Sequence, residues 1–434
     1  MISGLKMSGY RLLDDFSADF GPLTVVIGAN ATGKSTLIDA LRLICECAEF
    51  PLQKALDLHG WAPSLLNASS KGEKINWRLA FSKPKHQMRW AFLPLHENVG
   101  YTYEVTIGID RRLGQAVPEQ EVLRLTEPRS GFAGPFKFFE VSGDHAVIYD
   151  PRERHLVPFE DVFPKQDAQT PSDGKVTEAS KANLPEPPPQ ERALWLAQMR
   201  FHKEFPVVSW IRTLLSSLVF YPGFEVGRFS ALKTKAAEIR PEATLWASGE
   251  NLGTVLHEML TRRDYQGSAQ LLRNFTRSAY PTFEDITAET SYGTPPSVLV
   301  RVHEKGLSRA MELWDLSDGM LRFLCLGAAL LNPLPPPFVA IDEPETGLHP
   351  RLMPIIADMI KAASENTQVL ITTHSPDLLS RFDLDDVAVM VREGARASWR
   401  RPRNRASLRQ MLESVAGETL GDLLRSGELE EASQ

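Results

Sequence analysis

The sequence has few cysteines and no long apolar run. Its three cysteines, Cys45, Cys47 and Cys325, cannot form a disulfide framework, and such sparse usage favours a reducing compartment. Cys45 and Cys47 lie two apart on a predicted helix and share no face, so we interpret them as packing residues and not as metal ligands. No apolar run reaches the roughly 18 residues of a membrane-spanning helix, and the N-terminal residues lack the pattern of a secretory signal. We therefore expect a soluble, cytoplasmic protein with no membrane partner.

A large excess of one charge and internal repetition are also absent. The net charge of −7 excludes binding of nucleic acid through whole-molecule charge, so a contact with DNA requires a local basic patch. Hydrophobic residues make up 43% and charged residues 24% of the chain, which is normal for a globular protein. Because no heptad seam or repeat is visible, we expect no long coiled-coil arm.

The most informative stretch of the chain is residues 28–36. An apolar run, 23–27, precedes it and an amphipathic run, 37–44, follows it, so the order is a buried strand, a glycine-bearing loop and a helix. In this context the pattern G-x-x-x-x-G-K-[ST] is typical of a phosphate-binding loop. The predicted nucleotide-binding residues are Gly28, Ala29, Asn30, Ala31, Thr32, Gly33, Lys34, Ser35 and Thr36.

The residue types in this loop match the chemistry of a triphosphate. Gly28 and Gly33 allow the backbone to turn tightly enough for several N–H groups to face one anion. The helix that begins near Lys34 adds the positive end of its dipole. We expect Lys34 to reach the β- and γ-phosphates and the Ser35 hydroxyl to bind Mg²⁺.

A second group of polar residues follows apolar segments near the other end of the chain. Ser317 is a plausible N-cap for an apolar helix predicted over 321–331. The apolar run 338–341 reads as a buried parallel strand that ends in Asp342 and Glu343, where α/β sheets bind ligands. Asp342 would hold Mg²⁺, and Glu343 would act as the general base for the attacking water.

A histidine follows the next predicted strand, 369–372. His374 could donate a hydrogen bond to a γ-phosphate from this strand end. The alternative is a histidine whose hydrogen bonds are satisfied within a loop, and this residue alone does not decide between them.

The order of these motifs resembles the ATP-binding-cassette (ABC) ATPase family, and more narrowly its RecF/SMC/OLD-like branch. Within that branch the chain is similar to stand-alone bacterial "predicted ATPases" of the AAA_21 class, over roughly residues 1–385. The strings that carry the resemblance are GANATGKS at 28–35, LSDG at 316–319, IDEPETGLHP at 341–350 and TTHSP at 372–376, with FYPGF at 220–224 and GENLGTVL at 249–256. The resemblance implies an α/β fold: a P-loop ABC-type head with a mixed or parallel core sheet, an antiparallel β subdomain and a helical lobe.

The sequence divides into six expected segments. They are 1–60, the N-terminal part of the ATPase core; 61–162, the antiparallel β subdomain; 163–190, a flexible proline-rich loop; 191–310, the helical lobe; 311–390, the C-terminal part of the core; and 391–434, a basic and then amphipathic tail. Within the first segment we expect a strand over 7–13 and a helix over 36–57. Short strands are expected at 75–81, 101–109, 121–125, 137–141 and 146–149.

The resemblance also implies a site shared by two subunits. In these ATPases the signature of one subunit closes on the ATP of the other, so Ser317 and Gly319 would act in trans in a homodimer that holds two ATP molecules. His374 would be the switch histidine, residues 347–349 would form the D-loop at the interface, and Arg11 would face the nucleotide. Gln53 and Gln87 are the nearest candidates for the family's Q-loop glutamine.

What the ATPase drives stays open between two hypotheses. Lys34 and Ser317 are separated by 317 − 34 = 283 residues, much more than in transporter cassettes, and only 434 − 374 = 60 residues follow His374, too few for the Toprim nuclease domain of OLD proteins. An effector such as a nuclease would then be a separate chain. An arginine-rich run, 392–409, could contact DNA or be a solvated tail. The candidates are an ATPase of DNA repair or phage defence, and a nucleotide-gated scaffold that holds or releases a partner protein without DNA.

Overall fold

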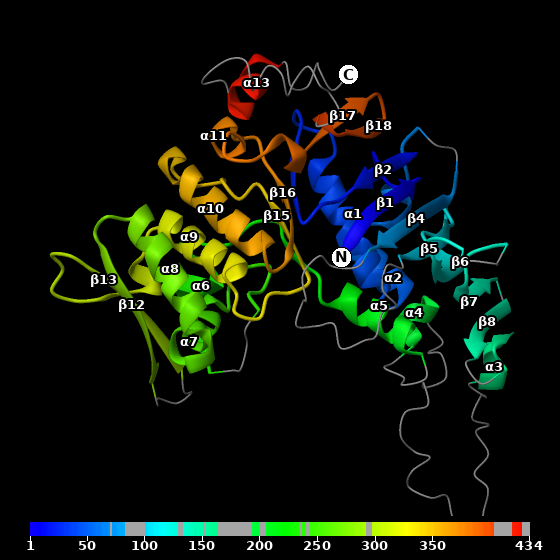
Figure 1. The fold of residues 1–434 in the computed structure, drawn as a ribbon, viewed down its shortest axis with the longest axis horizontal. Coiled ribbons are helices and arrows are strands. Elements are labelled where there is room, and N and C mark those ends of the chain that lie inside the picture. The colour runs from blue at the N-terminus through cyan, green and yellow to red at the C-terminus, as the bar shows by residue number, and fades with distance from the viewer. Residues whose placement is uncertain are drawn as a thin grey trace, which may run out of the picture. The chain divides into compact units, whose positions relative to one another are not determined.

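The chain, shown as a computed structural model in Figure 1, forms two compact units. The structure describes residues 1–69, 72–82, 100–128, 133–143, 145–150, 153–162, 193–199, 205–234, 237–239, 244–291, 297–402 and 419–427. Unit 1 contains Met1–Phe20, Asn30–Leu218 and Val391–Trp399, and unit 2 contains Gly21–Ala29, Val219–Met390 and Arg400–Gln434. Because these units follow spatial contacts and not sequence order, the six segments expected above stay a prediction.

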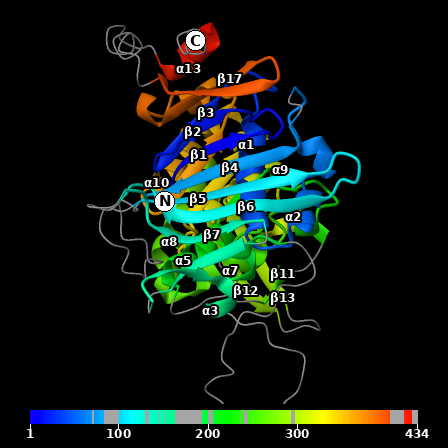
Figure 2. The same ribbon diagram turned by 90° about the vertical axis from the view of Figure 1, so that its right-hand side faces the viewer.

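Unit 1 is built on an eight-stranded antiparallel sheet, whose strands β1, β4, β5, β6 and β7 follow one another in Figure 2. In spatial order the strands are β2 (Phe16–Asp19), β1 (Ile2–Ser8), β4 (Lys74–Phe81), β5 (Tyr101–Ile109), β6 (Ala116–Leu125), β7 (Lys137–Ser142), β8 (His145–Asp150) and β9 (His155–Pro158). Alternation explains the sheet: in β4, Ile75, Trp77, Leu79 and Phe81 are buried and the residues between them are not. The predicted strands of this region are therefore confirmed, and β9 was not predicted.

The helices of unit 1 are grouped around the one that follows the phosphate loop. They are α1 (Lys34–Cys47), α2 (Leu52–Asp57), the 3₁₀ helix η1 (Ala62–Leu65), α3 (Phe159–Val162), α4 (Trp195–Gln198) and α5 (Pro206–Ser216). Helix α1 packs against α2 and α5. The predicted helix over 36–57 is in fact two helices, because Pro51 has no N–H to continue the first one. Cys45 and Cys47 are buried free thiols on α1, and burial raises the pKa of Cys47, so both are packing residues.

The core sheet has most of its strands in unit 2. The motifs expected at 341–350 and 372–376 lie at the ends of two of these strands. In order its strands are β10 (Val219–Tyr221), β15 (Phe338–Asp342), β16 (Gln368–Thr372), β3 (Leu23–Ile27), β17 (Val387–Glu393) and β18 (Arg396–Arg400). The pairs from β10 to β17 are parallel, and every residue of β3 and β16 is buried. Such continuous apolar runs are typical of parallel strands covered on both faces. The carboxyl ends of β15, β16 and β3 therefore lie along one edge.

Unit 2 also has helices that lie between these strands and after them in the sequence. They are α9 (Asp318–Leu330), α10 (Met353–Ser364), α11 (Pro376–Leu379) and α13 (Leu420–Ser426), with 3₁₀ turns η4 (Leu313–Asp315), η5 (Pro350–Leu352) and η6 (Leu384–Asp386). Helix α10 packs on α9 and on β16, and α13 packs on α11. Among the described residues, no helix combines the length and the apolar character needed to cross a bilayer.

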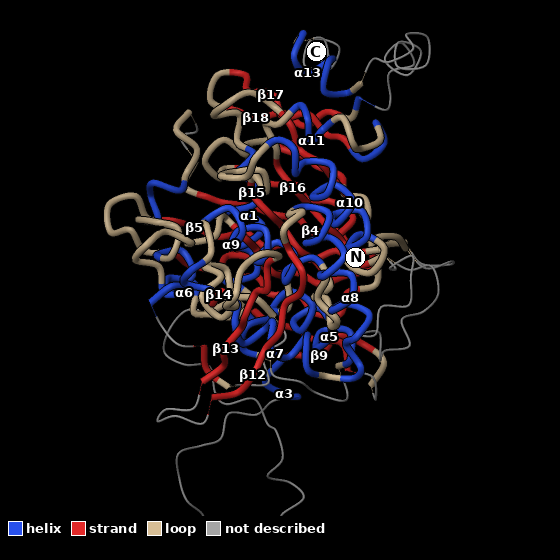
Figure 3. Tube along the Cα trace, turned by 90° about the vertical axis from the view of Figure 1, so that its left-hand side faces the viewer, coloured by secondary structure: helices blue, strands red, loops and turns tan. Residues whose placement is uncertain are grey.

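The rest of unit 2 combines helices with a small antiparallel sheet. Its elements are α6 (Ala231–Thr234), β11 (Ala237–Glu238), α7 (Leu252–Thr261), η3 (Arg263–Tyr265), α8 (Gln266–Ala279), β12 (Phe283–Ser291), β13 (Ser297–Glu304) and β14 (Met311–Glu312). Figure 3 shows β12 and β13 as two long neighbouring strands, and α7 and α8 both contact β12. The sequence predicts helices at 251–260 and 265–279, and α7 and α8 confirm them, whereas β12 was not predicted.

Two expectations about the chain's ends are wrong. The first strand is Ile2–Ser8 and not 7–13, because Tyr10 and Leu13 pair with each other in a tight turn and Arg11 takes a left-handed conformation with φ of 42°. The basic segment does not begin as a tail, because residues through Arg400 belong to β17 and β18 of the core sheet. The expected proline-rich loop at 163–190 lies outside the described residues, as does the arginine run beyond 402.

Candidate functional site

The predicted phosphate loop connects β3 to α1 through a strongly turned backbone. Gly28 has φ of 148°, Ala31 has φ of 62° and Gly33 has φ of 104°, and Gly33 stands at the N-cap of α1. No side chain caps this helix and no acidic residue lies in its first turn. A helix start of this kind favours an anion, because its N–H groups and its dipole both carry positive partial charge. Lys34 is buried and Ser35 is exposed at this start.

Arg11 is held by the helix that follows the loop. Its guanidinium forms an ion pair with Asp39 of α1 at 2.5 Å and donates to the carbonyl of His59 at 2.8 Å. The Tyr10 hydroxyl donates to the same Asp39 carboxylate. Asp39 lies one turn after Ser35, so this contact places Arg11 beside α1 within unit 1. Its role toward a nucleotide stays a prediction.

His59 connects two carboxylates of α1. Its ring nitrogens lie 2.6 Å from Asp39 and 2.6 Å from Glu46, and Arg42 pairs with Glu46 at 2.8 Å. Burial alone would lower the pKa of His59, but the hydrogen bonds with both carboxylates raise it. The same bonds lower the pKa of Asp39 and of Glu46 against the opposing effect of burial. This cluster joins the 59–60 turn to α1 and was not predicted from the sequence.

Asp342 and Glu343 lie at the carboxyl end of β15, as predicted. Thr372 of the neighbouring strand β16 donates from its hydroxyl to the Asp342 carboxylate. The N–H of Glu343 donates back to the Thr372 carbonyl at 3.2 Å and to its hydroxyl at 3.1 Å. Glu343 has φ of 48°, which turns its backbone out of the strand. Thr372 therefore fixes both acids at the strand end.

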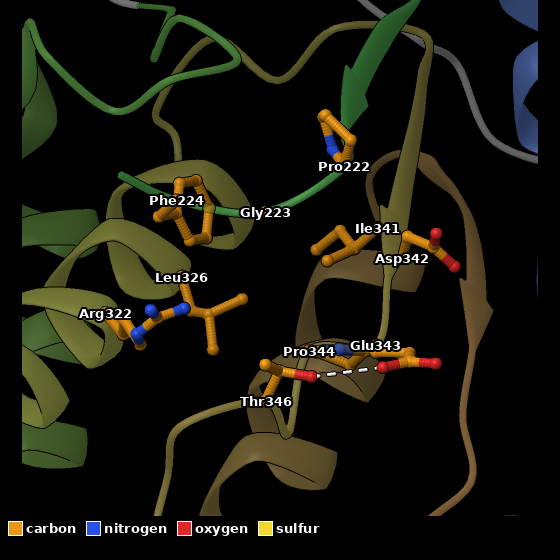
Figure 4. Close-up of a pocket in the computed structure, with 10 residues that line it drawn as sticks. All are labelled: Pro222, Gly223, Phe224, Arg322, Leu326, Ile341, Asp342, Glu343, Pro344 and Thr346. Atoms are coloured by element: carbon orange, nitrogen blue, oxygen red, sulfur yellow. Dashed lines mark hydrogen bonds between the residues drawn. The ribbon is translucent and has the colours of Figure 1, made fainter. Parts of the chain in front are cut away.

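His374 lies beside the predicted general base. Its Nε2 is 3.4 Å from the Glu343 carboxylate, and the two side chains are 34% and 42% exposed. Thr346 donates from its hydroxyl to the other Glu343 oxygen at 3.2 Å, as Figure 4 shows. The structure thus brings Asp342, Glu343 and His374 together within unit 2. The side chains of His374 and Glu343 both keep contact with solvent.

Glu345 is a functional candidate that the sequence analysis missed. One oxygen of its carboxylate accepts hydrogen bonds from the Thr373 hydroxyl at 2.6 Å, the His374 N–H at 2.9 Å and the Ser375 N–H at 3.2 Å. The other oxygen is buried and has no hydrogen-bond partner among the described residues. Glu345 therefore ties the His374 loop to the segment that follows the two acids. Its three donors come from residues 373–375 of the TTHSP string. The role of Glu345 is therefore visible only when the pairing of β15 with β16 is known.

The signature residues begin α9. The Ser317 hydroxyl accepts from the Met320 N–H at 3.2 Å, which confirms the predicted N-cap. Asp318 pairs with Lys233 of α6 at 2.6 Å. A Cβ placed on Gly319 would lie 3.7 Å from the carbonyl oxygen of Gly347, so the signature and the expected D-loop are neighbours in unit 2.

A cavity of about 130 Å³ lies behind the acids within unit 2. Figure 4 shows its walls, which come from the segment after β10, from α9 and from the end of β15. The lining residues are Pro222, Gly223, Phe224, Arg322, Leu326, Ile341, Asp342, Glu343, Pro344 and Thr346. None of the residues that line this cavity belongs to the predicted phosphate loop at 28–36.

Of the two glutamines considered for the Q-loop, the structure describes Gln53. Gln53 donates to Asp57 and to the Gly114 carbonyl, and accepts from the Ala116 N–H. Its amide thus connects α2 to the turn before β6. Gln87 lies outside the described residues.

The predicted magnesium ligands fit the ion. Ser35 offers an exposed hydroxyl, and Asp342 has one carboxylate oxygen outside its bond with Thr372. In the described part of the chain, no group of three or more His, Cys, Asp or Glu side chains could hold a metal alone. Mg²⁺ in phosphate sites is bound through one or two protein oxygens, with phosphate oxygens and waters completing its shell.

Comparisons with known proteins agree with these features. The AAA_21 family, described as "AAA domain, putative AbiEii toxin, Type IV TA system", matches residues 216–380, and the AAA_15 family, "AAA ATPase domain", matches residues 1–88. A curated relative, the DNA replication and repair protein RecF of Limosilactobacillus fermentum (strain NBRC 3956 / LMG 18251), is 31% identical over 80 residues, which are 18% of this chain. The chain matches 21% of that relative's length.

Solved structures show the same fold. An SMC head bound to the C-terminal winged-helix domain of ScpA has a TM-score of 0.51 and 12% identity, with 92% of this chain and 97% of that chain covered. An SMC head with an extended coiled coil, derived from Pyrococcus furiosus and bound to the C-terminal domain of ScpA, has a TM-score of 0.50 and 11% identity, with 95% and 99% covered.

In its fold and in the order of its site residues, this chain is similar to ABC-type ATPase heads. The two family matches and the short match with RecF extend the similarity to the RecF/SMC-like branch of that class.

Proposed function

We propose that this chain binds ATP with Mg²⁺ and hydrolyses it to ADP and phosphate. The observation that carries the proposal is the edge of unit 2 where Asp342, Glu343 and His374 meet. The strand beside this edge, β3, leads directly into the phosphate loop. In open α/β sheets, ligands bind outside the carboxyl ends of the strands.

Each residue has a defined part in this reaction. The backbone N–H groups of residues 28–36 and the Lys34 ammonium bind the phosphates. Glu343 accepts a proton from water while the water oxygen bonds to the γ-phosphorus and the bond from that phosphorus to the ADP oxygen breaks. His374 donates a hydrogen bond to the γ-phosphate. Ser35 and Asp342 would hold Mg²⁺, which would supply positive charge to the phosphate oxygens.

A homodimer that encloses two ATP molecules completes the proposal. Ser317 and Gly319 of one copy would close on the triphosphate bound by the other, with the 347–349 segment at the interface. The position of Ser317 at the start of the long helix α9 supports this, because N–H groups at a helix start bind anions. Arg11 is proposed to contact the nucleotide of its own copy.

Phosphate release in Mg²⁺-ATP tests the hydrolysis. We expect turnover by the wild type, and a loss of ATP binding in Lys34→Ala. Glu343→Gln should keep ATP binding and form a stable ATP-bound dimer, visible by light scattering. A Glu343→Gln protein that stays monomeric in ATP would contradict the shared site.

Mixing two inactive variants tests whether Ser317 acts in trans. Lys34→Ala lacks a phosphate cradle but keeps its signature, and Ser317→Arg has the reverse defect. A mixture should recover about a quarter of wild-type turnover, because half of randomly mixed two-fold dimers are heterodimers with one intact site. No recovery, with heterodimers present, would show that the signature acts in cis.

We propose that the ATPase works in DNA maintenance or phage defence with a separate effector, such as a nuclease. The name of the RecF relative and the toxin-system description of the AAA_21 family support this. DNA would contact the 392–409 region. Turnover that rises with DNA, and loses this rise when arginines beyond residue 402 are neutralised, is the expected result.

A nucleotide-gated scaffold is the second candidate. Two observations favour it: both SMC heads above were solved bound to ScpA, and arginines of the described run are engaged within the chain. Arg396 pairs with Asp14 at 2.9 Å, and Arg401 is buried. Turnover indifferent to DNA, together with a stable complex with another protein that ATP forms or releases, would favour this candidate.

A further inference from the structure

An arginine from the far end of the chain touches the phosphate loop. Arg392, near the end of β17, donates from one terminal nitrogen to the carbonyl of Ala31 at 3.4 Å and from Nε to the carbonyl of Gly394 at 2.8 Å. Ala31 and Arg392 are 361 residues apart in sequence and belong to the same unit. The left-handed backbone of Ala31 lies in the middle of the loop.

The turn after β17 is fixed beside this loop by several contacts. The Asn67 amide donates to the carbonyls of Arg11 and of Ala395. The Ala397 N–H donates to the Leu12 carbonyl at 2.8 Å. Arg396 adds its ion pair with Asp14, so the segments 11–14 and 394–397 are joined. Arg392 therefore extends from an anchored turn and not from a free end.

The guanidinium of Arg392 is exposed and contacts only carbonyl oxygens among the described residues. A guanidinium has five N–H donors and a planar face, and these contacts use two of the donors. Arg396, four residues on, has its charge matched by a carboxylate. Arg392 is thus a cation at the phosphate loop whose charge an anionic ligand can match.

The order of the core sheet indicates which end of the ligand Arg392 meets. Strand β3 has β16 on one side and β17 on the other. The groups proposed to act on the γ-phosphate, Glu343 and His374, come from the β15–β16 side. The nucleoside end must then point away from them, toward the end of β17.

We propose that Arg392 binds the nucleoside end of ATP, with its N–H groups on the α-phosphate and its face against the base. This rests on the proposed function, since it assigns a further residue to the same nucleotide. It also removes Arg392 from the set of arginines available to DNA.

Titration calorimetry with Mg²⁺ and three ligands tests the assignment: ATP, ADP and inorganic tripolyphosphate. Arg392→Ala should weaken ATP and ADP binding about tenfold or more, as expected for loss of a charged hydrogen bond. Tripolyphosphate keeps a phosphate at the α position but has no base, so Arg392→Ala should weaken its binding by a smaller factor than that of ATP. Arg392→Lys, which keeps the charge but not the planar face, should fall between wild type and Arg392→Ala.

Arg381→Ala is the matched control, since it removes an exposed arginine that belongs neither to the phosphate loop nor to the turn after β17. It should bind all three ligands like wild type. Equal melting temperatures without ligand show that the variants are folded. An unchanged Kd for ATP in Arg392→Ala, or an equal loss for tripolyphosphate, overturns the assignment alone. Failure of the wild type to bind ATP overturns the proposed function as well.

Discussion

Two histidine–carboxylate clusters of this protein use the same groups in opposite surroundings. In unit 1, the His59 side chain is 2% exposed and contacts Asp39 and Glu46, each at 2.6 Å. In unit 2, the His374 side chain is 34% exposed and lies 3.4 Å from Glu343. Both ring nitrogens of His59 are bound at short range. The His374–Glu343 pair keeps hydrogen-bonding capacity for groups outside the chain.

The contrast distinguishes a buried structural cluster from an exposed cluster whose residues are proposed to act on ATP. Removing one member of a buried ion pair leaves an uncompensated charge and costs stability. An exposed pair contributes little to stability, because water screens it. Mutations in the two clusters should therefore separate the free energy of unfolding from ATP turnover.

The largest expected effect is on turnover at the exposed pair. Glu343→Gln should lower ATP turnover by about 10²–10⁴-fold, the usual contribution of a general base. Its free energy of unfolding should stay within about 0.5 kcal/mol of wild type, as for a solvent-facing change. Steady-state phosphate release and urea unfolding measure the two quantities. A turnover within threefold of wild type would remove Glu343 from the chemistry.

A mutation in the buried cluster should change the free energy of unfolding and leave ATP turnover nearly unchanged. His59→Gln should lower the free energy of unfolding by about 3–5 kcal/mol, because it leaves two carboxylates of α1 without their shared partner. Urea unfolding measures this loss, and turnover per folded molecule should change little. A loss below 1 kcal/mol would mean that Arg11 and Arg42 already neutralise the carboxylates.

His374→Ala should lower ATP turnover, as Glu343→Gln does, but by a smaller factor. Loss of one hydrogen-bond donor to developing charge costs about 10²–10³-fold in favourable sites, and the solvent exposure of His374 places the expected loss near the lower end. Unfolding should be unaffected. Should His374→Ala destabilise the protein as much as His59→Gln, the distinction between the clusters would fail.

A mutation of Glu345 should affect both stability and turnover, and each only moderately. Glu345 is part-buried, and it would influence turnover only through the position of His374. Glu345→Gln removes a charge that three donors share and places an amide N–H₂ where the unpartnered oxygen stands. We expect a loss of about 1–3 kcal/mol in stability and a modest fall in turnover from a misplaced His374. The exposed Glu365→Gln, at the end of α10, is the matched control and should change neither quantity.

The smallest effect is a pH dependence of stability. The pKa of His59 is raised above its ordinary value of 6.5 in the folded state. Its stabilisation is therefore complete below pH 6.5 and is lost as pH rises through the folded-state pKa. Urea unfolding between pH 6 and 9 should show a decline in wild type that His59→Gln lacks. Parallel curves would show that His59 does not titrate in this range.

Much of the site was predictable because its signals are local. The loop at 28–35 has its strand and helix on either side in sequence, Ser317 stands directly before α9, and Asp342 ends an apolar run. These motifs need only neighbouring residues to be recognised. The same holds for the alternating strands of the antiparallel sheet.

The remaining features depend on pairings between distant segments. Thr372 reaches Asp342 across 30 residues, and Arg392 reaches Ala31 across 361. The placement of Arg11 follows from a tight turn that the alternating pattern of 7–13 conceals. The strands β17 and β18 were not predicted, because an arginine-rich run is also typical of a solvated tail. Only the pairing of these strands in the core sheet identifies them.

The left-handed backbone of Glu343 has a consequence for saturation mutagenesis at this codon. A side chain with a Cβ incurs roughly 1–2 kcal/mol in this conformation, whereas glycine and asparagine adopt it readily. Once the carboxylate is gone, abundance of the folded protein should rank substitutions by branching at Cβ, with valine and isoleucine lowest. Depletion of those two residues in a selection would then report on chain geometry, and only the glutamine allele, which keeps the length of the side chain, would isolate the acid.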